Sequence, residues 1–226
     1  MKTLRFQISS KSIPKYPGRV NQDAKFIFNS KKTGVAVVGV FDGLGGFPKS
    51  EEASKIACVT TKSDLKKIEP DIPSDELINK MKVSILRAND LIREFNEKEG
   101  IDEDQYASAC VGAFLPRGEA VIENIGDSRA YKVVDNGGNL DLRMLTVDCK
   151  FEYLQALFNS VSVPEVLDEN TIDKFLEFQK KIAKVETQVD IEELIPLLNY
   201  SWQHRHMLSY CLGGSVKIGF TKVNVA

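Results

Sequence analysis

The residues best suited to chemistry are Asp42 and the glycines Gly43, Gly45 and Gly46, which end an apolar run over residues 35–41. A continuous apolar run predicts a strand buried on both faces, because a strand with one buried face alternates apolar and polar residues. A carboxylate at the end of such a strand is unfavourable unless a cation or hydrogen-bond donors meet it. Glycines let the backbone approach a ligand closely. The segment indicates a site for a hard cation such as Mg²⁺ or Mn²⁺, and the simpler alternative is a glycine turn beside a solvated aspartate.

Further motifs follow one another along the chain. They are NQDA at 21–24, FDGLGG at 41–46, EEAS at 51–54, NIGDSRAY at 124–131, LTVD at 145–148 and LGG at 212–214. Together they resemble the metal-dependent serine/threonine protein phosphatase family, type 2C, over about residues 21–214. The specific part of the pattern is FDGxGG followed at this separation by NxGDSRAY, whereas each motif alone is weak.

The resemblance implies that two divalent ions, Mg²⁺ or Mn²⁺, activate a water molecule that hydrolyses a phosphate ester. By the same resemblance, Asp42 bridges the two ions and the backbone oxygen of Gly43 binds one of them. Asp23 corresponds to the acid that holds a metal-bound water, and Asp127 to a ligand of a weaker third metal site. For Asp127, a turn-capping role between strands is the alternative.

Arg19 precedes the NQDA motif, where the resemblance implies an arginine that clamps the substrate phosphate through bidentate hydrogen bonds. Arg19 lies one residue closer to the aspartate than the family pattern has it. A shift of one residue on a strand turns a side chain to the opposite face. Arg19 is therefore either the phosphate clamp, if the loop compensates, or a solvated surface charge.

Composition excludes several classes of protein. With 226 residues, 42% hydrophobic and 27% charged, the chain predicts one globular domain over residues 1–226. A net charge of −2 argues against nucleic acid or an anionic membrane as partner. No apolar run is long enough for a membrane span, and the N-terminus does not have the pattern of a signal peptide. The four cysteines are scattered, which predicts reduced thiols and a cytoplasmic location.

The elements that carry these motifs follow from local patterns. We expect strands at 4–8 and 24–28, the second forming a hairpin with the strand that ends at Asp42. A helix is predicted over 49–68 and a longer one over 74–100, with Ser74 as its cap. The longer helix has an apolar stripe made of Leu77, Met81, Ile85, Ala88, Ile92 and Phe95.

Strand patterns resume over 106–145, where turns at 117–118 and 135–139 predict a meander. A helical insertion is expected over 149–206. It contains His204 and His206, which have no third ligand near them in sequence, so we do not predict a metal site there. Strands, helices, strands and an insertion give an α+β order. The resemblance implies an antiparallel β-sandwich flanked by helices in four layers.

The resemblance also implies two further metal-binding aspartates in S-D-G and D-N motifs after the L-G-G segment, and the printed sequence has neither at that place. We therefore expect a C-terminally truncated fold that lacks closing strands, leaves Val37 and Ile122 partly uncovered and associates through its open sheet edge or its insertion. The expected function is hydrolysis of phosphoserine and phosphothreonine in a phosphoprotein substrate, with the chain itself inactive. The alternative is a non-catalytic relative that acts as a binding or regulatory module.

Overall fold

The computed structural model describes residues 6–45, 49–99, 106–146, 166–167 and 219–224. Their order of strands and helices confirms the α+β class. The elements are β1 (Asp23–Asn29), β2 (Ala36–Gly43), α1 (Ser50–Leu65), α2 (Ser74–Glu99), β3 (Ala107–Leu115), β4 (Glu119–Ile125), β5 (Tyr131–Asn136), β6 (Asn139–Met144), β7 (Val166–Leu167) and β8 (Gly219–Asn224).

The main sheet has the strand order β1-β2-β3-β4-β8-β7, and β5 and β6 form a separate two-stranded sheet. All pairs are antiparallel except β7 with β8, which is parallel and so departs from the expected antiparallel sheet. The expected meander is also wrong in one respect. Strands β5 and β6 form the predicted hairpin, with Gly137 and Gly138 at φ of 69° and 98° in its turn. Strand β4, however, pairs with β8 rather than with β5.

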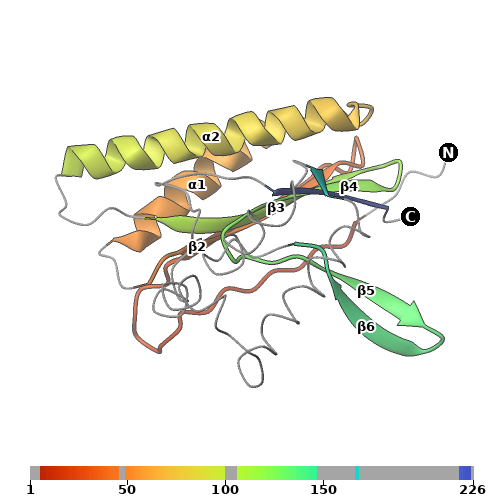
Figure 1. Cartoon of the computed structure of the whole chain (residues 1–226), viewed down its shortest axis with the longest axis horizontal. Coiled ribbons are helices and arrows are strands. Elements are labelled where there is room, and N and C mark those ends of the chain that lie inside the picture. The colour runs from red at the N-terminus through yellow and green to blue at the C-terminus, as the bar shows by residue number, and fades with distance from the viewer. Residues whose placement is uncertain (1–5, 46–48, 100–105, 147–165, 168–218, 225–226) are drawn as a thin grey trace, which may run out of the picture.

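Both helices lie on one face of the main sheet, as Figure 1 shows. The predicted stripe on α2 is confirmed, because Leu77, Met81, Ile85, Ala88 and Ile92 are fully buried, and Phe95 at its end is partly buried. Helix α1 contributes the small buried residues Ala53 and Ala57, which allow it to pack closely on β1 and β2. This layer of helix on sheet contains the larger hydrophobic core. Neither described helix is long and apolar enough to cross a bilayer.

A second, smaller core lies on the other face of the sheet. Cys110 of β3 and Ile122 of β4 pack there against Leu145, with Phe114 and Ala130 beside them. The β5–β6 hairpin projects on this side in Figure 1, and the amide of Leu145 donates to the carbonyl of Ala130 at its base. The second face is therefore covered over β3 and β4.

The prediction that β2 is buried on both faces is wrong for its second half. Val37 and Phe41 face the helices and are buried, whereas Val40 is 49% exposed and Asp42 is exposed. The physical reason is that Leu145 and its neighbours pack over β3 and β4 rather than over β2. The acidic end of β2 consequently lies at an accessible part of the sheet.

The expected exposure of Val37 and Ile122 is also wrong, since they are 0% and 5% exposed. Ile122 lies beneath Leu145, and β8 pairs with β4 along its length, so the edge next to β4 is occupied.

Ser74 does not cap α2 with its side chain. Its hydroxyl donates to Glu119, while the first turn closes through the carbonyl of Pro73.

Two other predictions concern segments that are partly described. Residues 6–8 of the expected first strand have no regular structure. Within the expected insertion 149–206, the described residues are the two of β7, which form a strand rather than a helix. The remainder of that insertion lies outside the described residues. So do His204, His206, Cys149, Cys211 and the L-G-G motif at 212–214. Cys58 and Cys110 are free and buried, as expected for reduced thiols.

Candidate functional site

The pairing of β1 with β2 brings two predicted site residues together. Asp23 begins β1 and stands directly opposite Asp42, the second-last residue of β2. Opposite residues in an antiparallel pair project from the same face, with Cβ atoms about 5 Å apart. The two carboxyl groups are close enough to share a hydrogen bond. Strand register therefore creates an acidic pair at this end of the sheet.

The surroundings of the pair disfavour the charged form of Asp42. The Asp42 side chain is exposed, but the surrounding protein removes part of the water around its carboxyl group. This desolvation, then the negative charges of Asp23 and Asp127, then the hydrogen bond with Asp23 raise the pKa of Asp42 to about 6. Lys15 acts in the opposite direction and lowers it. Asp127 lies in the turn after β4, next to Gly126, whose φ is 82°. The structure thus places Asp127 near Asp42, although the two are far apart in sequence.

A set of polar contacts links Asp42 with the turn that carries Asp127. Ser108 of β3 is opposite Asp42 in the register, and its hydroxyl is hydrogen-bonded to that of Ser128 at 2.6 Å. The side-chain amide of Asn124 donates to the carbonyl of Ser128 at 2.6 Å. Reasoning from the sequence missed Ser108, because its relation to Asp42 depends on a register between distant strands.

Three segments pack so closely at position 43 that only a glycine fits there. A Cβ atom at this position would lie 2.3 Å from the carbonyl oxygen of Ser50 and 2.8 Å from that of Gln22. The Gly43 amide donates to the Gln22 carbonyl at 3.1 Å, which also accepts from the Ser54 hydroxyl at 2.6 Å. The end of β2 is thus held against the start of α1 and the segment before β1, and the position of Asp42 is restrained.

The segment before β1 forms a closed loop. Its ends are joined by the Asn21 side-chain amide, which donates to the Ser12 hydroxyl at 2.6 Å. Within it, the Arg19 amide donates to the Tyr16 carbonyl at 3.2 Å, and Gly18 has a φ of 77°. Proline followed by glycine at the centre of such a turn is typical of type II geometry. Arg19 is exposed on this loop, and its predicted role as a phosphate clamp stays a prediction.

The acidic pair is suited to a divalent cation by its charge. Within residues 6–45, 49–99, 106–146, 166–167 and 219–224, no three histidine, cysteine, aspartate or glutamate side chains form a group that could hold a metal ion. Asp23 and Asp42 nonetheless offer adjacent carboxylate oxygens, and the pKa of Asp42 is raised by desolvation first and then by the negative charge of Asp23. Carboxylate oxygens are the preferred ligands of Mg²⁺ and Mn²⁺. A bound cation would reduce the repulsion between the two carboxylates, so these residues fit the divalent ion that the sequence predicts.

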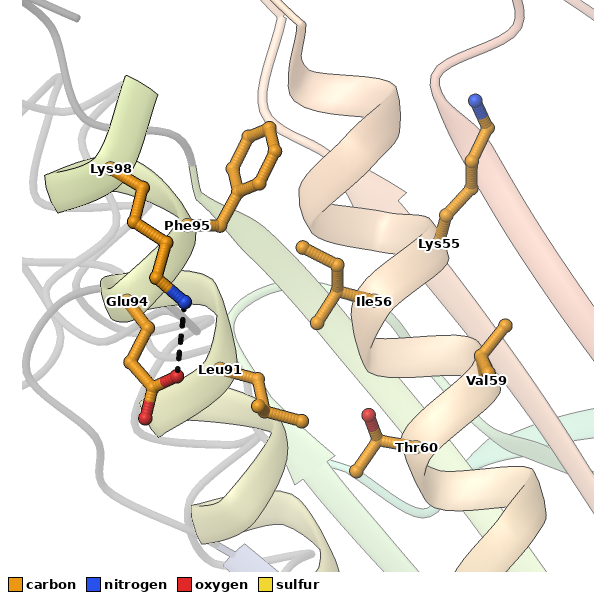
Figure 2. A pocket seen from close by; sticks show the side chains of 8 residues that line it. All are labelled: Lys55, Ile56, Val59, Thr60, Leu91, Glu94, Phe95 and Lys98. Atoms are coloured by element: carbon orange, nitrogen blue, oxygen red, sulfur yellow. Dashed lines mark ion pairs between the residues drawn. The ribbon is translucent and has the colours of Figure 1, made fainter. Parts of the chain in front are cut away.

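A separate groove lies between α1 and α2, as Figure 2 shows. Its volume is about 450 Å³, and it is open to solvent. It is lined by Lys55, Ile56, Val59, Thr60, Leu91, Glu94, Phe95 and Lys98. Glu94 and Lys98 form an ion pair at 3.9 Å along one side. The groove contains none of the aspartates described above, and it is a surface feature of the helical layer.

Comparison with known proteins places these features in context. The family model described as Protein phosphatase 2C matches residues 15–180. The serine/threonine phosphatase stp of Listeria welshimeri is 29% identical over 128 residues, which are 57% of this chain and 48% of that protein. The chain thus spans about half the length of the curated relatives it matches.

Two solved structures show the same fold. Serine/threonine phosphatase Stp1 from Staphylococcus aureus has a TM-score of 0.65 and 18% identity, covering 99% of this chain and 74% of that one. The serine/threonine phosphatase of S. agalactiae has a TM-score of 0.64 and 18% identity, covering 96% and 73%. At this level of identity the likeness concerns the fold.

Proposed function

The chain belongs to the protein phosphatase 2C family, and we propose that it acts in the metal-dependent hydrolysis of phosphoserine and phosphothreonine in a phosphoprotein substrate. The observation that carries the proposal is the Asp23–Asp42 pair at the accessible end of the sheet. Desolvation, and after it the negative charges of Asp23 and Asp127, raise the pKa of Asp42 to about 6, and a bound cation would counteract both effects. The family depends on divalent metal ions in general, and Mg²⁺ or Mn²⁺ as the ions here is part of the proposal.

The residues have distinct proposed roles. Asp42 and the Gly43 carbonyl would hold the metal ions, Asp23 would hold a water molecule beside them, and Asp127 would contribute to a weaker third metal site. When bound, the ions would acidify a water molecule and neutralise phosphate charge. The packing around Gly43 keeps Asp42 in place before a ligand arrives, and such preorganisation avoids a reorganisation cost during reaction. Buried free thiols at Cys58 and Cys110 support a reducing, cytoplasmic location as a further part of the proposal.

The experiment measures Mn²⁺ binding and hydrolysis of an aryl phosphate and a phosphothreonine peptide on the same samples. Wild-type protein is expected to bind Mn²⁺, and Asp42→Asn to bind it at least about tenfold more weakly, because a charged ligand is lost. In a longer protein that also contains the S-D-G and D-N motifs, hydrolysis is expected to require Mn²⁺ or Mg²⁺, to stop with EDTA and to fall by orders of magnitude in Asp42→Asn. Equal Mn²⁺ affinity in the two proteins would remove Asp42 from the site.

The printed 226 residues have no S-D-G motif, and their D-N pair, Asp135-Asn136, lies at the β5–β6 turn. We therefore expect the 226-residue chain by itself to turn over substrate weakly or not at all. Mn²⁺ binding that depends on Asp42, without turnover, would support the alternative of a non-catalytic relative that binds phosphorylated ligands. A robust rate that EDTA abolishes and that a mock purification lacks would contradict the expected inactivity.

A further inference from the structure

The turn that carries Asp127 is attached to the sheet by two polar contacts. The hydroxyls of Ser108 and Ser128 are hydrogen-bonded at 2.6 Å, and either of them can be the donor. The side-chain amide of Asn124 donates to the backbone carbonyl of Ser128 at 2.6 Å. Ser128 follows Asp127 directly in the sequence. The residue next to Asp127 is therefore restrained through both its side chain and its backbone.

Ser108 connects this turn with the acidic end of β2. It stands opposite Asp42 in the register of β2 and β3, so the two side chains project from the same face of the sheet, with Cβ atoms about 5 Å apart. Ser108 is 0% exposed, whereas Asp127 and Ser128 are partly buried. A buried hydroxyl without a partner is unfavourable. The fold therefore favours the arrangement of the turn in which Ser108 and Ser128 remain bonded beside Asp42.

The two ends of the turn are held independently of the hydroxyl bond. At its start, Gly126 has a φ of 82°, a left-handed conformation that glycine adopts readily. At its end, the Ala130 amide donates to the Thr146 hydroxyl at 3.2 Å, and the Ala130 carbonyl accepts from the Leu145 amide at 2.9 Å. Loss of the hydroxyl bond should therefore leave the turn in place and allow the carboxyl group of Asp127 to change its direction.

We propose that Ser108 is a positioning residue for ion binding, because through Ser128 it sets the direction of the Asp127 carboxyl group relative to Asp42. The inference rests on the proposed function, in which Asp127 contributes to a metal site near Asp42. Ser108 acts through its neighbours and is not itself a ligand. Hydrogen-bonded groups around a metal ligand commonly orient that ligand, and their loss weakens metal binding. Orientation before the ion arrives also reduces the entropy that binding costs.

The test is a Mn²⁺ titration of the 226-residue chain, with free Mn²⁺ followed by electron paramagnetic resonance so that stronger and weaker sites are resolved. Asp127→Asn identifies the site that depends on Asp127. At that site, Ser108→Ala and Ser128→Ala are each expected to bind Mn²⁺ about three- to tenfold more weakly, because each removes the same hydrogen bond. Ser108→Thr keeps a hydroxyl and should stay within about twofold of wild type.

A double-mutant cycle distinguishes positioning from a general loss of packing. In the Asp127→Asn background, Ser108→Ala should change Mn²⁺ affinity by less than about twofold, because no carboxylate is left to orient. Ser84→Ala is the matched control. Ser84 is 1% exposed, lies on α2 at the other face of the sheet, and its hydroxyl has no partner among the described residues. Its removal should leave Mn²⁺ affinity unchanged.

The outcomes separate this inference from the proposed function. If Mn²⁺ binding depends on Asp42 but is unchanged in Ser108→Ala, or is unchanged in Asp127→Asn, the inference is overturned and the function stands. If Ser108→Ala weakens binding equally with and without the Asp127 carboxylate, Ser108 acts on the fold alone and the inference is also overturned. If wild-type protein binds no Mn²⁺, both are overturned. Circular dichroism melts check the fold of each variant, and Ser128→Ala provides the same test from a partly buried position if Ser108→Ala does not fold.

Discussion

Asp42 combines two properties that an ordinary folded core avoids. It is an acid at the end of a strand whose other face is packed, and desolvation together with two nearby acids raises its pKa to about 6. Without a cation, the ionised form of Asp42 is less favourable in the folded protein than in the unfolded chain. Asp42 therefore lowers the stability of the folded protein while it supplies a ligand for a cation site, and functional residues commonly lower stability in this way.

The sign of this effect gives a prediction for Asp42→Asn in metal-free buffer. Because the folded pKa lies above the ordinary value of 3.8, the contribution of Asp42 to wild-type stability falls as pH rises from about 4 to about 6 and is constant beyond. The variant lacks this titration. Its melting temperature should exceed that of wild type by about 1–3 °C at pH 8 and match it near pH 4.

The control for this prediction is the addition of Mn²⁺ at pH 8. A ligand that binds the folded state raises the melting temperature. Mn²⁺ should therefore raise the melting temperature of wild type and change that of Asp42→Asn little. A variant that melts below wild type at pH 8 without metal would show that Asp42 makes a stabilising contact. The repulsion described here would then be the wrong explanation.

At the scale of elements, the end of β2 is positioned by contacts that neighbouring segments make with its backbone. Gly43 is packed against the carbonyls of Ser50 and Gln22. The carbonyl of Leu44 accepts from the Ser50 hydroxyl at 2.6 Å, and its amide donates to the Tyr106 carbonyl at 3.0 Å. Helix α1, strand β2 and the segment before β3 therefore meet within two residues of the acidic pair.

Gly43→Ala should destabilise the protein by about 1–3 kcal/mol or more, because the new methyl group would meet backbone atoms at 2.3 Å and 2.8 Å. Gly45→Ala is the matched control, since its nearest contact would be the Gln22 side chain at 3.7 Å, an ordinary van der Waals distance. Urea unfolding of both variants measures the difference. Equal stability of the two variants would show that the junction relaxes at little cost.

At the scale of the whole molecule, strand β4 contains two glutamates in opposite environments. Glu123 is 1% exposed, and among the residues that the structure describes neither of its carboxylate oxygens has a hydrogen-bond partner. Burial raises its pKa to about 8. Partial burial also pushes the pKa of Glu119 upward, but hydrogen bonds from Arg117 and Ser74 outweigh it and lower the pKa overall. The same strand thus contains one acid that opposes folding when charged and one that supports it.

This contrast predicts how global stability changes with pH. The folded pKa of Glu123 lies above its unfolded value of 4.5, so wild-type stability falls between about pH 4.5 and pH 8. Glu123→Gln should match wild type within about 1 kcal/mol at pH 5 and exceed it by roughly 2–4 kcal/mol at pH 9. Denaturant unfolding at the two pH values is the measurement.

Glu119→Gln is the matched control on the same strand, and its effect has the opposite sign. A lowered pKa means that the charged form stabilises the fold above about pH 4.5. The variant should therefore lose roughly 1 kcal/mol at pH 8. If Glu123→Gln also loses stability at pH 9, Glu123 has a partner when charged, and its burial without one is not the cause of the pH dependence.

The sequence by itself determined the features that arise within a few residues. Apolar residues spaced three and four apart predicted α2 and its buried stripe, and glycine-rich turns predicted both hairpins. The order of short motifs identified the family and named Asp23, Asp42 and Asp127 as a group. The predictions of α2, of the turns and of the family succeeded because helical period, turn conformation and motif spacing depend on neighbouring residues, whereas the roles of the three aspartates stay predictions.

Only the tertiary structure decided which distant groups meet and which are buried. The register of β1, β2 and β3 places Asp23 and Ser108 opposite Asp42. The burial of Glu123 without a partner is equally a result of packing. Register and burial arise from contacts between segments far apart in the chain, and no local pattern of residue types encodes them.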